Sequence, residues 1–473
     1  MKSEGGTGCR LKSVVVVRIG RAHPSVGHSG CSLPFASGVE YTAMYMYTRT
    51  PSITVRYSSP RGPSLPPPDP PAPAPLEEPS DEDSFDTPTT ASSFEALVAA
   101  HCPTTQTEFI PSIKRGPFKG LRQSMLMGGC SVEATRKPTV SRETLVCTHG
   151  SDVAIDWYDV DLTVATDPTA GPDCPVLISF PSAGQLNTGE GLLIYLPTEM
   201  AERRNGRCRC GTAVFHGAGG LPLTSHELPG SCYCGSDCVG TILRAAHKRF
   251  PNSPIIVGCV SLGSAMFSNW AARNADECKS LGVSCAFYGC FGDSVRETRR
   301  TADTWPMGLG AIGRGVIYGW LDEINNCKES LRTIAALEEK HPTFSFAKLK
   351  KCKSLRQWDD ATRMLYGYDS DEEMLAACDV RTVLHRHALP TLFINAKDDF
   401  LCPAGRMDGE VYDQMPNFAR IVTNSGGHFG YVSSIPKKGD GGMDGAAHTP
   451  WLINIVEEFV ELGVKLAAGE ARV

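Results

Sequence analysis

The chain has 473 residues, a net charge of −6 and 41% hydrophobic residues. This length accommodates one core domain of about 250 to 350 residues with a tail. The acidic balance argues against the basic groove that nucleic-acid binding needs, so we expect no nucleic-acid partner. No apolar run approaches the roughly 20 residues that cross a bilayer, so no transmembrane helix is expected. The 19 cysteines are scattered through expected strands and helices, which indicates mostly reduced core thiols in a cytoplasmic or organellar protein.

Residues 1–95 differ in composition from the rest of the chain. They are basic at first, then proline-rich over 63–75 and acidic over 77–86. Such a segment buries too little apolar surface to order itself, which predicts a disordered extension. Its basic start also suits an organelle transit segment, with an unstructured tail as the alternative, so the compartment stays open.

Expected strands and helices alternate from about residue 140, which predicts an α/β domain over residues 100–465. We expect a mainly parallel eight-stranded sheet with helices on both faces. The expected strands are 143–147, 153–157, 175–180, 211–215, 254–260, 283–288, 390–395 and 419–423. Helical patterns occupy 240–249, 264–274 and 450–462. A mixed basic and apolar helical region over 294–389 follows the sixth strand, where such a sheet would carry a lid.

The apolar strand 254–260 leads directly into a turn of small residues with Ser261 at its tip. A strand, a sharp Ser-x-Gly turn and a helix make the nucleophile elbow that exposes a reactive serine above a sheet. Cys259 stands where the G-x-S-x-G pattern has its first glycine. Alone, the pattern equally suits an ordinary serine at the end of a core strand.

A reactive serine needs a histidine that takes its proton and an acid that orients the histidine. Strand 390–395 ends at Asp398 and Asp399, and strand 419–423 ends at a glycine-flanked His428. The order serine, aspartate, histidine is that of the α/β-hydrolases. Asp398 and Asp399 are both candidates for the acid.

Further segments resemble the YheT-like, or embryogenesis-associated, group of α/β-hydrolases, which includes the abhydrolase-domain type 1 and type 3 enzymes of animals. The resemblance covers about residues 105–463. It is carried by 142–145 with 152–157, by 223–225 with Asp237 and 248–251, and by 358–368, 389–399 and 425–430.

The resemblance implies an α/β-hydrolase fold with a helical lid and a serine esterase or lipase. Ser261 matches the nucleophile, His428 the general base and Asp399 the orienting acid. The resemblance favours Asp399 because it stands four residues before Pro403, as the acid of the group does, and Asp398 is the alternative. The implied substrates are lipid acyl esters such as monoacylglycerols or medium-chain phospholipids, and no cofactor is expected. Two other functions stay open: an alcohol O-acyltransferase with the same residues, and a catalytically silent α/β-hydrolase used for binding.

The oxyanion hole is expected to combine the backbone N–H groups of Leu262 and Ala183. Residues 181–186 depart from the pattern of the group, because Ser182 replaces a glycine. This departure bears on activity rather than on fold.

Two further patterns are assigned to structure. The G-x-G-x-x-G of residues 308–313 lacks the preceding strand of a dinucleotide site and indicates close helix packing or a flexible lid. A possible zinc site consists of two C-x-C pairs with one further cysteine and a histidine: Cys208 with Cys210, Cys232 with Cys234, Cys238 and His226. The one-residue gaps within the pairs suit a tetrahedral zinc ion poorly, so no metal is expected.

A basic run in the expected lid consists of Lys348, Lys350, Lys351 and Lys353. It lies beside Phe344, Phe346 and Leu349, a mixture that favours peripheral contact of the lid with an anionic membrane. A solvated helix face is the alternative. The sequence makes no prediction of the oligomeric state.

Overall fold

The computed structural model describes residues 53–55, 93–111, 114, 119–122, 124, 139–159, 174–183, 200, 203–204, 207–230, 237–306, 308–403, 412, 415–431 and 450–473. Apart from residues 53–55 and 93–95, the expected extension lies outside the described residues.

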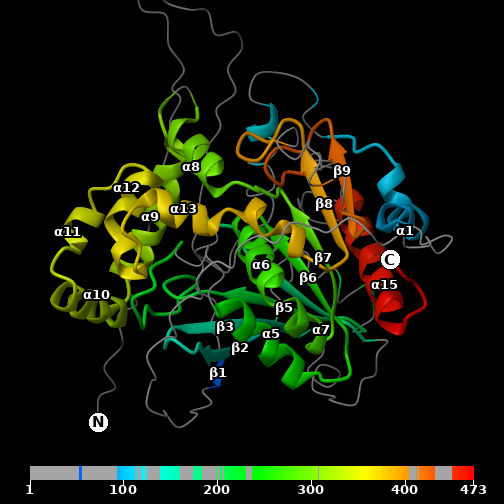
Figure 1. Cartoon of the computed structure of the whole chain (residues 1–473), viewed down its shortest axis with the longest axis horizontal. Helices are drawn as coiled ribbons and strands as arrows, with labels where there is room; N and C mark the ends of the chain where they lie inside the picture. Colours follow the sequence, from blue (N-terminus) through cyan, green and yellow to red (C-terminus); the bar gives the residue numbers. More distant parts are fainter. Residues whose placement is uncertain are drawn as a thin grey trace, which may run out of the picture.

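A single mainly parallel sheet forms the centre of the molecule (Figure 1). Its strands are β1 (Ile53–Val55), β2 (Thr139–Val146), β3 (Asp152–Asp159), β4 (Val176–Phe180), β5 (Arg209–Val214), β6 (Ile255–Val260), β7 (Val283–Gly289), β8 (Thr391–Ala396) and β9 (Phe418–Thr423). The order is β1-β2-β3-β5-β4-β6-β7-β8-β9, and only the pairs of β3 with β2 and with β5 are antiparallel. The predicted α/β-hydrolase fold with its eight strands is confirmed.

The sheet has one strand more than predicted. Residues Ile53–Val55 pair in parallel with β2 at the edge of the sheet. These three residues fall within the predicted extension. A β-branched Ile-Thr-Val triplet suits a strand, and the edge of β2 offers backbone groups that need partners.

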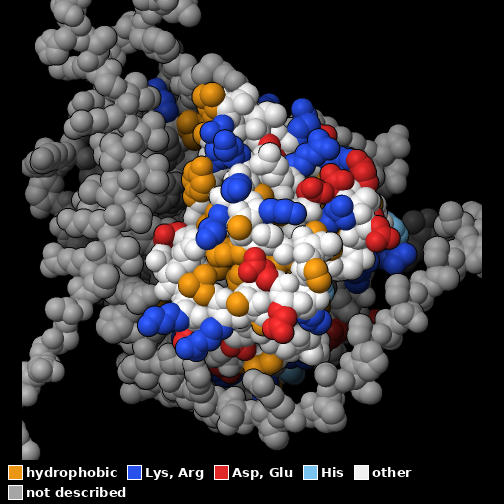
Figure 2. Space-filling model, turned by 90° about the vertical axis from the view of Figure 1, so that its left-hand side faces the viewer, with side chains coloured by type: hydrophobic (Ala, Val, Ile, Leu, Met, Phe, Trp, Pro, Cys, Tyr) orange, Lys and Arg blue, Asp and Glu red, His pale blue; other side chains and the backbone are white. Residues whose placement is uncertain are grey.

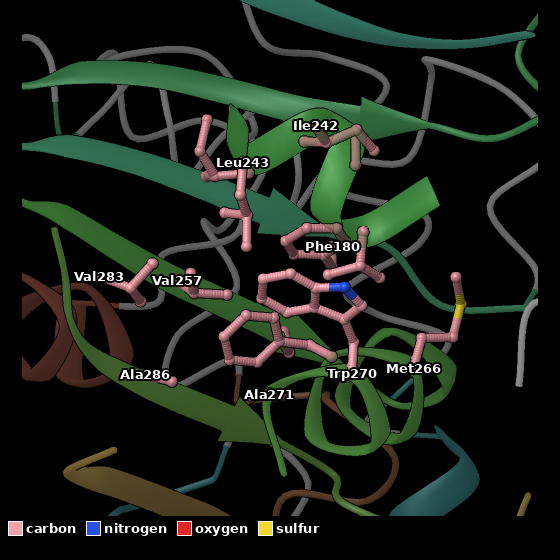
Figure 3. Packing of buried hydrophobic residues seen from close by; sticks show 14 of the residues in the cluster. Phe180, Ile242, Leu243, Val257, Met266, Trp270, Ala271, Val283 and Ala286 are labelled. Atoms are coloured by element: carbon pink, nitrogen blue, oxygen red, sulfur yellow. The ribbon is translucent and has the colours of Figure 1, made fainter. Parts of the chain in front are cut away.

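Helices cover both faces of the sheet. On one face lie α5 (Cys238–Arg249), α6 (Leu262–Arg273) and α7 (Ala275–Ser280), and on the other lie α1 (Phe94–His101), followed by the 3₁₀ turn Pro103–Gln106, and α15 (Pro450–Ala468). In Figure 3, Ile242 and Leu243 of α5 and Trp270 of α6 pack around Phe180 and Val257 of the sheet. Because β4 and β6 are buried along their whole length, their sequences are continuous apolar runs rather than alternating ones.

The apolar stripe predicted for the C-terminal helix is confirmed. The stripe residues of α15 are all buried against the sheet: Leu452, Ile455, Val456, Phe459 and Val460. Phe459 also meets Phe94 of α1 edge to face, with ring centroids 6.3 Å apart. The domain therefore begins before residue 100, because Phe94 is completely buried in this core.

Residues 294–389, between β7 and β8, form a helical insertion with a hydrophobic core of its own. It contains α8 (Val295–Thr304), α9 (Ala311–Asn325), α10 (Lys328–Lys340), α11 (Phe346–Leu349), α12 (Leu355–Thr362), α13 (Asp371–Cys378) and the 3₁₀ turns Arg363–Tyr366, Val380–Thr382 and Leu384–Arg386. Figure 1 shows α9 to α12 gathered to one side of the sheet. Trp320 and Trp358 meet in its core with ring centroids 5.1 Å apart, and a buried ion pair joins Arg299 to Asp359.

The glycines of the G-x-G-x-x-G pattern lie where α8 turns into α9. A Cβ on Gly313 would stand 2.4 Å from the Asp303 carboxylate, and one on Gly310 would stand 2.5 Å from the Asp303 carbonyl oxygen. The pattern therefore serves close helix packing, as predicted.

The basic run of the insertion is exposed, but its apolar neighbours are not. Lys348, Lys350, Lys351 and Lys353 lie at the surface, whereas Phe344, Phe346 and Leu349 are buried in the core of the insertion. Figure 2 faces this side of the molecule and shows basic side chains interspersed with acidic and apolar ones. The expected surface mixture of lysines and aromatic side chains is therefore not present. Only the lysines lie at the surface, because the apolar side chains of this segment turn inward.

Most of the described cysteines are reduced. Among the described cysteines only Cys378 is disulfide-bonded, and nearly all of the others are buried. Within the described ranges, no helix has the length and apolar character needed to cross a membrane.

Candidate active site

Ser261 lies at the tip of the turn that joins β6 to α6. Its backbone has φ 53° and ψ −114°, a conformation that costs a residue with a side chain on the order of 1 to 3 kcal/mol. The turn is held from both sides: the Ser261 N–H donates to the Gly289 carbonyl at 2.9 Å, and the Ser264 N–H donates back to the Ser261 carbonyl at 3.1 Å. The strained turn points the hydroxyl away from the strand, as the elbow pattern predicts.

The two small residues around Ser261 have different roles. A Cβ on Gly263 would stand 2.3 Å from the carbonyl oxygen of Phe180, so the loop after β4 packs directly on the elbow and requires glycine there. Cys259, which replaces the first glycine of the pattern, is completely buried within β6 and belongs to the main hydrophobic core. The elbow therefore forms with a thiol at this position.

The structure brings Ser261, His428 and Asp399 together in one chain of hydrogen bonds. The Ser261 Oγ lies 3.0 Å from His428 Nε2, and His428 Nδ1 lies 2.9 Å from Asp399 Oδ2. The Asp399 side chain is 0% exposed and that of His428 is 14% exposed. The other oxygen of Asp399 accepts the backbone N–H groups of Leu401 and Cys402, each at 2.8 Å. These bonds hold the carboxylate in place and leave it facing the imidazole.

Asp398 points away from the imidazole, unlike Asp399. Its Oδ1 accepts the Gly427 N–H at 2.9 Å, and its Oδ2 lies 3.6 Å from Lys119 Nζ. Lys119 also donates to Ser425 Oγ at 2.8 Å. Asp398 and Lys119 therefore hold the loop that carries the histidine. Sequence reasoning missed Lys119, because nothing in the sequence marks a contact across 306 positions.

The two expected oxyanion donors lie at and near the elbow. Leu262 is the first residue of α6, and the first N–H groups of a helix have no partner within it. Ala183 lies in the loop after β4, two residues after Pro181, whose carbonyl packs with that of Phe180 against Gly263. The Ala183 carbonyl accepts the indole N–H of Trp320 at 3.2 Å. Residues 184–186 lie outside the described residues.

No family model matches the sequence. Among curated proteins, the chain is similar to human "Phospholipase ABHD3", with 22% identity over 353 residues that cover 72% of this chain and 78% of that one. It is similar to human "Monoacylglycerol lipase ABHD2", with 23% identity over 341 residues that cover 70% and 76%. With YheT of Escherichia coli (strain K12), provisionally named an esterase, the identity is 32% over 287 residues, which cover 58% of this chain and 75% of YheT. The chain belongs to the YheT-like group of α/β-hydrolases. This membership confirms the predicted family and the class of carboxylic ester hydrolases.

In this YheT-like hydrolase, the helical insertion is linked to the histidine through Phe400. The ring of Phe400 lies 5.8 Å from that of His428 and stacks on Trp305 at 4.8 Å. Trp305 comes from the insertion, directly after α8, and both aromatic side chains are half-buried. Together they form an apolar wall beside the imidazole.

The cysteine pairs considered for zinc do not come together. Cys208 and Cys210 lie at the start of β5 with sulfurs 3.8 Å apart and pack in the core on the α15 face, whereas Cys238 packs in the core on the opposite face. Cys232 and Cys234 lie outside the described residues. Nearer the serine, Cys290, Asp399 and His428 place potential ligand atoms within 4.8 Å of one another, and the imidazole of this group also contacts Ser261 Oγ through its second nitrogen.

Proposed function

We propose that this YheT-like hydrolase is a serine esterase that cleaves lipid acyl esters, with Ser261 as nucleophile, His428 as general base and Asp399 as orienting acid. The observation that carries the proposal is the continuous set of contacts from the Ser261 hydroxyl through both ring nitrogens of His428 to a buried carboxylate. A buried carboxylate beside Nδ1 keeps the proton on that nitrogen and leaves Nε2 free to accept the proton of serine.

In the reaction, the Ser261 Oγ attacks the ester carbonyl while His428 Nε2 takes its proton. The negative oxygen of the tetrahedral intermediate binds the backbone N–H groups of Leu262 and Ala183, each contributing on the order of 3 to 4 kcal/mol. The imidazolium, stabilised by Asp399, then gives its proton to the leaving alcohol. Water repeats the sequence on the acyl enzyme and releases the acid.

The substrate class rests on two supports. The relatives are named for phospholipid and monoacylglycerol substrates, and the wall of Trp305 and Phe400 offers apolar surface next to the reacting atoms. An apolar wall with a few polar groups at one end suits an acyl chain attached to an ester. We therefore propose monoacylglycerols or medium-chain phospholipids as substrates.

We further propose that residues 294–389 act as a lid whose side chains select the substrate. Leu309, Tyr318 and Leu331 of this region are exposed large apolar side chains. Beside the exposed lysines they would support peripheral contact with an anionic membrane. Co-sedimentation with vesicles of anionic and of neutral phospholipid checks this, and equal binding to both would contradict it.

Labelling by a fluorophosphonate probe tests the role of Ser261. The matched control is Ser264→Ala, because Ser264 is buried in the next turn of α6 and its hydroxyl has no hydrogen-bond partner among the described atoms. We expect the wild type and Ser264→Ala to be labelled and Ser261→Ala to remain unlabelled. Equal labelling of Ser261→Ala and the wild type would refute the proposal.

The same assays separate the alternatives. An acyltransferase would label equally but transfer the acyl group to added glycerol in preference to water, which product analysis detects. A silent binding protein would leave the wild type unlabelled. The serine at position 182, where the group has glycine, is the remaining argument for a catalytically silent protein, because Cys259 is accommodated in the core.

We propose that residues 1–95, apart from Ile53–Val55 and the start of α1, form an extension that can serve as a transit segment. Fusing residues 1–95 to a fluorescent reporter tests this role. A diffuse cytosolic signal would exclude import.

A further inference from the structure

A second cluster of reactive side chains lies at the carboxyl ends of β2 and β5. Both strands run antiparallel to β3, so these ends meet at the same edge of the sheet. Two groups of potential metal ligands share Cys238 there, and each group has its ligand atoms within 4.8 Å of one another: Cys147 with His149, and His216 with Glu227. They come from the end of β2, the turn before β3, the segment after β5 and the start of α5.

The separations between these atoms resemble those between the ligands of one metal ion. The sulfurs of Cys147 and Cys238 are 3.3 Å apart, and Cys238 Sγ lies 3.9 Å from His149 Nε2 and 3.6 Å from Glu227 Oε2. With Zn–S near 2.3 Å and Zn–N or Zn–O near 2.0 Å, tetrahedral geometry places ligand atoms roughly 3.2 to 3.8 Å apart.

The imidazole and carboxylate of the cluster lie closer together than two metal ligands would. His149 Nε2 and Glu227 Oε2 are 2.6 Å apart, a hydrogen-bond distance. They would have to separate by about half an ångström to share a tetrahedral ion. His149 is the most exposed member of the cluster, with 24% of its side chain accessible, so it has room to move.

Burial makes the grouping significant. Cys147, His216, Glu227 and Cys238 are all buried, and both thiols border the main apolar core. A buried carboxylate is costly unless it is paired with positive charge. A divalent cation would offset two of the three negative charges that this carboxylate and two thiolates would carry, and sulfur, nitrogen and oxygen ligands together suit zinc.

The buried pair Cys208 and Cys210 provides a contrast. Their sulfurs are 3.8 Å apart, yet among the described residues they belong to no group of potential metal ligands. Two thiols close together are therefore not sufficient to identify a metal site. The cluster around Cys238 differs because an imidazole and a carboxylate also lie beside its thiols.

We propose that Cys147, His149, Glu227 and Cys238 bind a structural zinc ion. His216, whose Nδ1 lies 3.7 Å from Glu227 Oε2, positions the carboxylate. Four protein ligands close the coordination sphere, which makes the site structural rather than catalytic. The signal missed in the sequence was the one-residue gap between Cys147 and His149, because it joins a thiol to an imidazole rather than two thiols.

The ion would fix the segment on which the helical insertion rests. Immediately after Glu227, the Leu228 N–H donates to the hydroxyl of Tyr366 at 3.2 Å. A Cβ on Gly230 would stand 2.5 Å from the ring of Trp320 in α9, so the segment packs tightly on the insertion. Zinc would thus tie the β2–β3 turn, this segment and α5 into one support for the insertion.

Elemental analysis of the full-length protein, purified without chelators and dialysed, tests the proposal. The wild type should carry about one zinc ion per chain, Cys238→Ala should lose it, and the buried-thiol control Cys210→Ala should keep it. Ser261→Ala should also keep it, so this result does not depend on the proposed esterase activity. Zinc-free wild type after reconstitution, or full zinc in Cys238→Ala, would overturn the site.

A second measurement on the wild type covers a variant that fails to fold. Reconstitution with Co²⁺ should produce a thiolate-to-cobalt charge-transfer band in the near ultraviolet, which added zinc abolishes. A spectrum without this band refutes thiolate ligation. Peptide mapping without reduction that finds a disulfide between Cys147 and Cys238 would equally refute it, because both sulfurs would then be consumed.

Discussion

Replacing Asp399 by asparagine removes one negative oxygen from the proposed triad and changes little else. Oδ1 of Asp399 accepts two backbone N–H groups, from Leu401 and Cys402. An asparagine keeps its carbonyl oxygen toward these donors, because its NH₂ group cannot accept them. The NH₂ group then faces His428 Nδ1, where Oδ2 stood at 2.9 Å, while the retained oxygen, 3.0 Å from Nδ1, is already engaged by the two backbone N–H groups.

Two donors cannot face each other, so the imidazole must move its proton from Nδ1 to Nε2. An Nε2–H cannot accept the proton of Ser261, from which it lies 3.0 Å away. In serine triads this loss of tautomer lowers kcat by about 10⁴-fold, which corresponds to about 5 kcal/mol of transition-state stabilisation. The fold should persist, since both backbone hydrogen bonds remain.

Asp398→Asn is the matched control. Its amide oxygen can still accept the Gly427 N–H, and only the half-exposed contact with Lys119 weakens, at a cost of about 0 to 1 kcal/mol. Steady-state hydrolysis of a p-nitrophenyl acyl ester measures kcat for both variants. If Asp398→Asn lost as much activity as Asp399→Asn, or Asp399→Asn retained wild-type kcat, the assignment of the acid would be wrong.

Three further predictions concern the elbow, the oxyanion loop and a buried histidine. Gly263→Ala should destabilise the fold by about 1 to 3 kcal/mol and lower probe labelling, because the added Cβ would collide with the Phe180 carbonyl. Urea unfolding measures the first effect, and an unchanged unfolding midpoint together with an unchanged labelling rate would contradict the packing. Trp320→Phe keeps an aromatic side chain, although a smaller one, and loses the indole N–H that bonds to the Ala183 carbonyl. We therefore expect kcat to fall roughly fivefold, equivalent to about 1 kcal/mol, with KM unchanged; a wild-type kcat would exclude a positioning role. Burial lowers the pKa of His387 from 6.5 to about 4. Between these two values the unfolded chain binds a proton at this histidine and the folded chain does not. The stability that the neutral His387 contributes is therefore fully present above pH 6.5 and is lost as the pH falls towards 4. Urea unfolding between pH 7 and pH 4 should show a loss of about 3 kcal/mol that is absent in His387→Gln, and equal pH dependence of the two proteins would contradict this.

Local pattern was sufficient for the elements of the sheet and for the three residues that meet at its edge. Strands such as β4 and β6 are continuous apolar runs because both their faces are covered. Ser261, Asp399 and His428 each follow a strand, and parallel strands bring their carboxyl ends to one edge. Their meeting could therefore be predicted from their order in the chain.

Contacts between distant segments could not be predicted in this way. The basic run of the insertion was expected to share the surface with Phe344 and Phe346, but both rings turn into a local core that only the packing of α9, α10 and α12 creates. Lys119 holds the histidine loop from far away in sequence. Residues 53–55 form a strand only because β2 presents an open edge.

The sequence by itself determined the fold class and the order of the candidate catalytic residues, because strand periodicity and the turn after each strand are local properties. Only the tertiary structure decided which of Asp398 and Asp399 faces the imidazole, because adjacent side chains on a turn point in different directions. It also decided that Cys238 meets Cys147 and His149 rather than Cys208 and Cys210. The physical reason is the antiparallel pairing of β3 with its two neighbours, which brings the ends of β2 and β5 together.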